Sequence, residues 1–491
     1  SGADQTSVHF NCVSGEMDCI NNTTPFDSLI FQNAGTLRAC QANYASATNT
    51  SYALNSILGT GEFSTSILLE NCTINQLNGK LVYLMSGTTS SIYNLNLNSS
   101  CSDMGRLSTS YAGAPPATLN AASGTISIDY AILEGIQASG GATFNANNVI
   151  DLGGNSGWNI SALVTRDLYW VGGTGDWNDP NHWSLSSGGA SAGCTPNRLD
   201  NVFFDANSLG AGDTVYLPHL EQYAGDLTVN GVTGSPTFFG DYITLYGSLD
   251  LNHQMNWRLY QTHLRSPRTG SILRTTGTPF MYLTYGDSCW YTLQDSLYAE
   301  WIYQQNGNVD YNGQNVNTRL LSGYPSAQAI TANSTFFLKD MYFDGTFIGS
   351  ATTDIEFDKG PAYCRNNRAS TFRSMHFSVR GYLSDSVSVN TILADESIDI
   401  GNANLFTDAE FHKDVNVSGS NSIDNLLLAN GGYNFSQAPG ETLTLGTSLQ
   451  VQADCNGLAG IRSTIAGSPS SISMASGNVV VDFVSLNSIA A

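Results

Sequence analysis

A long stretch near the N-terminus recurs near the C-terminus, and this internal repeat restricts the fold more than any other feature of the chain. The sequence "ASGTISIDYAILEGIQA" (residues 122–138) returns 353 residues later as "ASGNVVVDFVSLNSIAA" (residues 475–491). Further upstream, "FDSLIFQNAGTL" (residues 26–37) matches "FRSMHFSVRGYL" (residues 372–383) at an offset of 346. Loop insertions produce small changes of offset, so the sequence indicates a repeat unit of roughly 350 residues.

The repeat also predicts how the chain is divided. Residues 1–165 are expected to form the C-terminal part of one unit, and residues 166–491 most of the next unit, which stops before its own closing segment. Cys101 falls opposite Cys455 in this alignment. We therefore expect a Gly-rich segment like residues 139–158 to follow the last residue of the chain.

The residue pattern between the two copies predicts the fold class. Short alternating runs such as "YITLYGSLDL" (residues 242–251) and "TFFLKDMYF" (residues 335–343) lie between turns rich in Gly, Asn, Ser and Asp. Only 12% of the residues are charged and 49 are Gly, which favours strands over helices. The sequence therefore predicts an all-β chain folded as a parallel β-helix or β-solenoid repeat array, with coils of roughly 20 to 25 residues. Tandem β-sandwich domains are the alternative, although no pattern recurs at about 100 residues.

Charge and cysteine content narrow the possible partners. The chain has 18 Lys and Arg against 40 Asp and Glu, a net charge of -22, so nucleic acid and anionic membrane surfaces would repel it. No apolar run approaches the roughly 18 residues that span a bilayer. The nine cysteines include no C-x-x-C pair, which gives no support to a zinc ribbon. We expect no nucleic-acid partner, no membrane insertion and no resident cofactor apart from a calcium ion considered below.

The two ends of the repeat unit resemble a known family. The segments "RDLYWVGGTGDWNDPNHWSLSSGGASAGCTPNRLDNVFFDANS" (residues 166–208) and "SGGATFNANNVIDLGGNSGWNI" (residues 139–160) resemble the repeat region of very large cell-surface adhesins of Bacteroidota. These include the SprB-like gliding-motility adhesins, which are substrates of the type 9 secretion system. The resemblance implies an extracellular, cell-surface filament whose repeats give reach and surface attachment. It also implies the type 9 secretion and gliding machinery as partners of the parent protein, with surface glycans or abiotic surfaces as targets.

The same resemblance implies O-glycosylation, because Bacteroidota glycosylate exported proteins at Asp followed by Ser or Thr and then a small or apolar residue. Four such triplets occur, three of them "DSL" or "DSV" and one "DTV". The acceptors would be Ser28, Thr214, Ser296 and Ser386.

The stretch "YWVGGTGDWNDPNHWS" (residues 169–184) is unusually rich in Trp and in oxygen-bearing side chains. One hypothesis is a structural joint in which tryptophans fill the seam between two units. The other is a calcium site, because calcium takes about six to eight oxygen ligands from flexible loops. The joint would use Trp158, Trp170, Trp177 and Trp183, whereas the calcium ligands would be Asp176, Asn178, Asp179, Asn181, Asp200 and Asp205.

Two further classes of function compete with a structural or adhesive segment. A polysaccharide-active β-helix enzyme needs clustered carboxylates, but here they are dispersed, with the densest group at residues 394–402, and the seven histidines show no ligand spacing. A carbohydrate-binding module array would use the tryptophan clusters. The aromatic residues of "CWYTLQDSLYAEWIYQQ" (residues 289–305) would suggest glycan stacking if they form an exposed stripe, and core or ladder packing is the alternative. Asp residues clustered in one groove would favour the enzyme, and a row of exposed aromatic rings would favour the binding module. We expect no catalytic residues.

Overall fold

The computed structural model describes five early strands between Ser7 and Ala47 by their backbone, and most of residues 66–490. Side chains are described from residue 68 onward, except that of Asn366. Outside the described part lie residues 1–6, 11–13, 19–25, 32–33, 39–40, 48–65, 112, 219–221, 287, 367–369, 385–386 and 491.

The chain folds as an all-β parallel solenoid of about 21 turns. This confirms the predicted fold class, and the tandem β-sandwich alternative is wrong. The only helical elements in the described part are two short 3-10 helices, η1 (Pro180–His182) and η2 (Ser350–Thr352). The chain divides into two compact units: residues 1–171, 175–200 and 217–222 form the first, and residues 172–174, 201–216 and 223–491 form the second.

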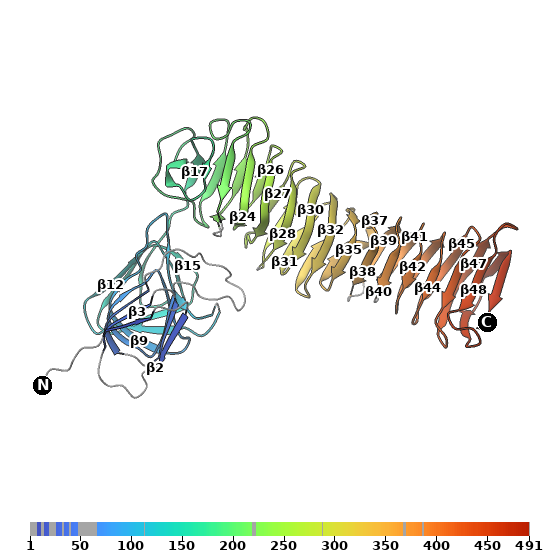
Figure 1. Cartoon of the computed structure of the whole chain (residues 1–491), viewed down its shortest axis with the longest axis horizontal. Coiled ribbons are helices and arrows are strands. Elements are labelled where there is room, and N and C mark those ends of the chain that lie inside the picture. The colour runs from blue at the N-terminus through green and yellow to red at the C-terminus, as the bar shows by residue number, and fades with distance from the viewer. Residues whose placement is uncertain are drawn as a thin grey trace. The chain divides into compact units, whose positions relative to one another are not determined.

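The first unit contains two parallel sheets (Figure 1) and most of the Trp-rich stretch at residues 169–184. One sheet has the order β1-β3-β5-β7-β9-β11-β14, and the other has the order β12-β15-β13-β10-β8-β6-β4-β2, with β16 paired to β15. The strands of this unit are β1 (Ser7–Phe10), β2 (Ser14–Asp18), β3 (Phe26–Phe31), β4 (Ala34–Arg38), β5 (Gln41–Ala47), β6 (Ser66–Glu70), β7 (Thr73–Asn78), β8 (Leu81–Leu84), β9 (Thr89–Asn96), β10 (Gly105–Thr109), β11 (Ala117–Asn120), β12 (Thr125–Asp129), β13 (Ala131–Glu134), β14 (Ile136–Ser139), β15 (Thr143–Asp151), β16 (Asn159–Ala162), β17 (Asp167–Trp170), β18 (Gly175–Asp176) and β19 (Trp183–Ser184).

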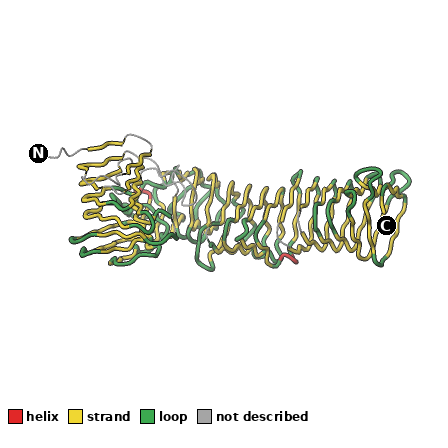
Figure 2. The backbone as a smooth tube through the Cα atoms, turned by 90° about the horizontal axis from the view of Figure 1, so that it is seen from below, coloured by secondary structure: helices red, strands yellow, loops and turns green. Residues whose placement is uncertain are grey.

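The second unit stacks its coils in long parallel ladders. Figure 2 shows strands lying side by side from coil to coil, with loops between them. The strands along this part of the chain are β20 (Asn201–Phe204), β21 (Thr214–Leu217), β22 (Gln222–Ala224), β23 (Leu227–Val229), β24 (Thr237–Leu245), β25 (Leu249–Leu251), β26 (Asn256–Leu264), β27 (Ser271–Arg274), β28 (Pro279–Tyr285), β29 (Trp290–Leu293), β30 (Leu297–Gln304), β31 (Gly307–Asp310), β32 (Asn315–Gly323), β33 (Ala327–Ile330), β34 (Thr335–Leu338), β35 (Asp340–Phe343), β36 (Thr346–Ile348), β37 (Asp354–Phe357), β38 (Ala362–Asn366), β39 (Ser370–Phe377), β40 (Gly381–Ser384), β41 (Val387–Ala394), β42 (Ile398–Ile400), β43 (Leu405–Phe411), β44 (Val415–Val417), β45 (Ser422–Ala429), β46 (Asn434–Gln437), β47 (Thr442–Gln452), β48 (Ala459–Ser463), β49 (Ser470–Met474), β50 (Asn478–Asp482), β51 (Val484–Asn487) and β52 (Ile489–Ala490).

The alternating sequence pattern determines which side chains enter the core of each coil. Along β26, Trp257 and Leu259 are buried while Arg258 and Tyr260 face outward, as expected where successive side chains point to opposite faces of a strand. Like residues then stack between neighbouring coils: Phe357 of β37 lies 4.4 Å from Phe377 of its partner β39. Each such buried ring contributes about 2 kcal/mol through area removed from water.

Buried asparagines bind the turns of neighbouring coils to one another. The Asn404 side chain is fully buried, and its Oδ1 accepts a hydrogen bond from the backbone N–H of Val387 (3.0 Å). Its backbone N–H donates in turn to Oδ1 of Asn421, also at 3.0 Å. Both asparagines repeat the same bond 17 residues apart, so each one satisfies a backbone donor of the preceding coil that the strand ladder leaves unpaired.

Replacing Asn404 by Ala should therefore destabilise the second unit. The Val387 N–H would lose its buried acceptor, which costs about 1–3 kcal/mol. Urea unfolding should show a lower midpoint for Asn404→Ala and little change for Asn402→Ala, whose side chain is exposed. Equal stability of the two variants would contradict this role for the buried amide.

Candidate functional site

Three tryptophans of the Trp-rich stretch form one closed cluster in the first unit. Trp170 of β17 pairs with Trp183 of β19 across an antiparallel bridge, and both rings are fully buried together with Trp177. The Trp170 and Trp183 ring centroids are 5.0 Å apart, and those of Trp177 and Trp183 are 4.8 Å apart. Trp183 Nε1 donates to the Trp177 carbonyl at 2.7 Å. His182 stacks on Trp170 at 4.6 Å, so this stretch builds its own small aromatic core.

Trp158, the fourth tryptophan of the predicted joint, belongs to a different cluster. It packs against the core of the first unit, with its ring 5.3 Å from that of Phe144. Its Nε1 donates to the carbonyl of Ile136 at 3.2 Å. The four tryptophans are close in sequence, but Trp158 and the other three serve different cores.

Asp176, Asp179 and Asp205 each accept a hydrogen bond from a backbone N–H two residues ahead in the chain. Asp176 accepts from Asn178 at 2.8 Å, Asp179 from Asn181 at 2.9 Å, and Asp205 from Asn207 at 2.9 Å. Asp179 thereby caps the 3-10 helix η1, and the backbone hydrogen bond from Asn181 lowers the pKa of its carboxyl group. These carboxylates stabilise their own turns.

Asp200 binds an arginine that lies 34 residues earlier in the chain. Its fully buried side chain accepts from Arg166 Nη2 at 2.6 Å and from Arg166 Nε at 3.0 Å. The Asn197 backbone N–H donates to the same carboxylate at 2.9 Å. In the part of the chain that the structure describes, no three His, Cys, Asp or Glu side chains gather in a way that could hold a metal ion. The calcium hypothesis stays a prediction, and the ion pair offers another account of Asp200.

The predicted glycosylation sites lie in different environments. Thr214 begins β21, is half-buried, and its backbone N–H donates to Thr174 Oγ1 at 3.1 Å. Ser296 is also half-buried, and its carbonyl accepts from Thr275 Oγ1 at 3.0 Å. Ser28 lies in β3, where only the backbone is described, and Ser386 lies outside the described residues. All four sites stay predictions.

A row of aromatic rings crosses the outer face of the second unit. Tyr242, Tyr260, Tyr282 and Trp301 come from the neighbouring strands β24, β26, β28 and β30. Their successive ring centroids are 6.0, 4.8 and 4.4 Å apart, and the last pair is stacked. Partial desolvation and a hydrogen bond with Tyr260 raise the pKa of the Tyr282 phenol. The Tyr282 phenol therefore stays neutral around pH 7 and presents an uncharged ring face.

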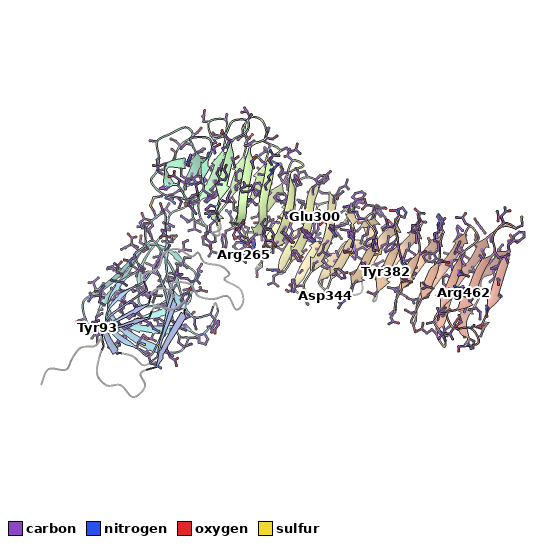
Figure 3. All side chains as sticks on the ribbon, viewed as in Figure 1. Tyr93, Arg265, Glu300, Asp344, Tyr382 and Arg462 are labelled. Carbon is purple, nitrogen blue, oxygen red and sulfur yellow. A yellow bond between two sulfur atoms is a disulfide. The ribbon has the colours of Figure 1, made fainter. Side chains whose placement is uncertain are left out.

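An open groove of about 680 Å³ adjoins this row. Its lining includes Tyr260, Met281 and Tyr298, which are exposed by 50%, 46% and 44%. Arg258 and Glu300 are the charged residues of its lining. Glu300, which Figure 3 labels on the second unit, lies 3.5 Å from Arg319. These large side chains therefore lie together on an open face of the second unit, an arrangement that suits contact with another molecule.

A second row on the same solenoid alternates imidazoles with carboxylates. His376 lies between Glu356 and Asp395, with N–O distances of 2.8 Å to each. His412 lies between Asp395 (3.0 Å) and Glu410 (2.7 Å). Burial lowers the pKa of His376, but its hydrogen bonds to Asp395 and Glu356 outweigh burial and raise the pKa overall. Each group is paired within the row, which favours a structural charge network over a catalytic pair.

Both rows follow from the length of one coil. The members of the aromatic row, Tyr242, Tyr260, Tyr282 and Trp301, are separated by 18, 22 and 19 residues. His376, Asp395 and His412 are likewise separated by 19 and 17 residues. The histidines show no local ligand spacing because most of their partners lie about one coil away in the sequence. A search at the coil period of about 20 residues would have found both rows.

Comparison with known proteins adds no relative from which a function could be transferred. No family model, curated protein or solved structure matches the chain. Among the residues that the structure describes, none of the helical segments has the length and apolar character needed to cross a membrane.

The tryptophan cluster leads to a stability prediction. Trp177→Ala should lower the stability of the first unit by about 3–5 kcal/mol, because it removes a fully buried ring. Thermal unfolding of this variant should lose the same number of degrees with and without EDTA. If EDTA instead destabilised the unaltered protein by many degrees, the calcium hypothesis would be correct.

The buried imidazole of His263 leads to a prediction about pH. Burial, with a smaller effect of Arg265, lowers the pKa of His263 to about 4, and neither ring nitrogen finds a hydrogen-bond partner among the described residues. The pKa of His263 is lower in the folded state than in the unfolded state, so protonation of this imidazole favours unfolding. The fold therefore keeps its full stability above about pH 6.5 and loses part of it as the pH falls toward 4. The largest loss is on the order of 3 kcal/mol.

His263 lies in register between Thr244 and Thr284, so His263→Thr copies its neighbours. This variant should lose less stability than the unaltered protein between pH 6.5 and 4, measured by chemical unfolding. His376→Gln should differ from the unaltered protein mainly above pH 6.5. The pKa of His376 is raised, so the unaltered fold gains stability as the pH falls through that pKa toward about 6.5, and the variant should lack this gain. Parallel pH curves for all three proteins would contradict both assignments.

Proposed function

We propose that this chain is a structural and adhesive repeat segment of a secreted cell-surface protein, and that its aromatic groove binds neutral glycan chains. The observation that carries the proposal is the exposed row of Tyr and Trp rings beside an open groove. Sugar rings present C–H faces that pack on aromatic rings, while their hydroxyl groups need hydrogen-bond partners at the edges.

The geometry of the groove suits an extended polymer. The rings come from successive coils, which are spaced by about 4.8 Å, a distance comparable to the length of one sugar ring. Arg258 and Glu300 lie where they can bond hydroxyl groups. The net charge of -22 would repel anionic polysaccharides, so neutral glycans are the favoured class.

The cell-surface location is supported by chemistry that does not involve the groove. Cys101 and Cys194 form a disulfide across 93 residues, and disulfides persist in oxidising compartments outside the cytoplasm. The resemblance to the large adhesins of Bacteroidota points the same way. On this proposal the type 9 secretion and gliding machinery handles the parent protein, and the solenoid gives the filament its reach.

A glycoside hydrolase is the second candidate, and the groove favours it less. Glycoside hydrolysis generally uses two carboxyl groups across one glycosidic bond. In the described part of the chain, Glu300 is the one carboxylate that lines the groove, and it faces Arg319. The arrangement supports binding without cleavage.

The glycan proposal is tested by affinity electrophoresis in gels that contain a neutral polysaccharide, such as xyloglucan or galactomannan, with polygalacturonate as the anionic contrast. The protein should be retarded by at least one neutral polymer. Tyr260→Ala and Tyr298→Ala should each weaken binding about tenfold, which corresponds to about 1.4 kcal/mol of lost ring contact.

Tyr363→Ala is the matched control, because Tyr363 is also exposed but stacks on Tyr382 outside the groove, at 4.6 Å. It should bind like the unaltered protein. Free migration in every neutral gel, or an equal loss in the control, would refute the proposal.

A further inference from the structure

The aromatic groove offers a ligand more hydrogen-bond donors than acceptors. Arg258, Trp301 and Asn317 line the groove and carry side-chain N–H groups. A guanidinium and an indole only donate, and an amide donates through its nitrogen. Among the described residues, Glu300 is the one carboxylate of the lining, and it lies 3.5 Å from Arg319. The polar groups of a bound ligand therefore meet mainly donors.

The guanidinium of Arg258 is available to such a ligand. Arg274, for comparison, is paired with Asp250 at 2.8 Å. Arg258 is exposed and has no ion pair or hydrogen bond of this kind with any residue that the structure describes. Its N–H groups can therefore donate to a molecule in the groove.

The amide of Asn317 is held in one orientation by a lysine. The Lys359 Nζ donates to Asn317 Oδ1 at 2.8 Å. An ammonium group only donates, so it binds the oxygen end of an amide. The nitrogen end of Asn317, with its two N–H groups, is left for a ligand. Lys359 is thus a positioning residue that makes Asn317 a donor to the groove.

Apolar side chains lie beside this donor. Pro279, Tyr298 and Asn317 are in register on the successive strands β28, β30 and β32. Tyr298 and Met281, both in the lining, are exposed by 44% and 46%. A ligand group that combines an acceptor oxygen with a small apolar part fits these surroundings best.

An acetyl group has both properties. Its carbonyl oxygen only accepts, and its methyl group packs against apolar side chains. A hydroxyl group both donates and accepts, so beside donors alone its own proton finds no protein partner. The acetyl group is also uncharged, so the net charge of -22 does not repel it.

We propose that the glycan bound in the groove is a polymer of acetamido sugars, whose acetyl carbonyl accepts from the Asn317 amide while the methyl group packs on Tyr298. This inference rests on the proposed glycan-binding function and specifies the class of sugar. Arg258 lies on β26, three strand pairings from Asn317 on β32, which corresponds to about 14 Å. It therefore contacts another sugar residue of the same chain.

The experiment compares two neutral polymers in affinity gels, fully acetylated glycol chitin and hydroxyethyl cellulose. Both are hydroxyethylated chains with the same backbone linkage, and they differ in whether each sugar carries an acetamido or a hydroxyl group at one position. Glycol chitin should bind about tenfold more tightly, because a site that hydrogen-bonds a ligand group discriminates against the analogue that lacks it.

Asn317→Asp separates the acetyl contact from the rest of the groove. The carboxylate keeps the size of the amide and the bond from Lys359, but it has no N–H to donate. This variant should lose the preference for glycol chitin. It should bind hydroxyethyl cellulose like the unaltered protein, which also shows that the groove is intact.

Lys359→Met tests the positioning role. It should reduce the ratio of the two affinities severalfold while leaving binding to hydroxyethyl cellulose unchanged. Lys359→Arg should restore the ratio, because arginine also only donates. Lys413→Met is the matched control, since it removes the same charge from an exposed lysine outside the groove lining. It should keep the full preference.

The outcomes distinguish this inference from the glycan proposal on which it rests. Equal retardation of the unaltered protein in the two gels would overturn the acetamido class and leave glycan binding standing. Stronger retardation by polygalacturonate than by glycol chitin would overturn it too, because the donors would then recognise a carboxylate. An unchanged preference in Asn317→Asp would overturn the role of Asn317. Free migration in both gels and in xyloglucan and galactomannan would overturn the glycan proposal as well.

Discussion

Parallel pairing of each coil with the coil before it is the interaction on which the rest of this structure depends. The strand ladders run with nearly constant register, so residues about 20 positions apart lie side by side for most of the second unit. Backbone hydrogen bonds hold the coils together, and the inward side chains of each coil are covered only by neighbouring coils. Stability is consequently shared between neighbouring coils.

The same register places residues that recur along the sequence into continuous rows on the surface. One outward aromatic residue on one strand forms no extended surface. Outward aromatic residues on four successive coils together form the continuous row from Tyr242 to Trp301. Outward His and acidic residues produce the paired charge row around Asp395 in the same way. A solenoid can thus present a long linear binding face without any loop built for that purpose.

Much of the fold could be predicted from the sequence, because alternation, turn residues and the long repeat are all local or periodic signals. The sequence indicated the kind of contact in the groove, because the aromatic residues at 289–305 suggested ring stacking. It did not indicate which rings pack against each other, because that depends on the number of residues in each coil. The ion pair between Arg166 and Asp200 and the disulfide between Cys101 and Cys194 join residues 34 and 93 positions apart. No local sequence motif indicates such contacts, so the sequence alone could not show that Asp200 pairs with Arg166. It also could not show that Trp158 packs against Phe144, apart from the other three tryptophans.

The coil register itself can be measured by the distance between spin labels, introduced as unnatural amino acids at Gln261 and Tyr363. These positions are connected through Tyr282, Trp301, Leu320 and Asp340 by five successive strand pairings. Five coil spacings of about 4.8 Å predict a narrow distribution centred near 24 Å by pulsed dipolar spectroscopy. A broad distribution, or one centred near 40 Å or more, would show that the coils do not stack in this register, and the aromatic row would then have no structural basis.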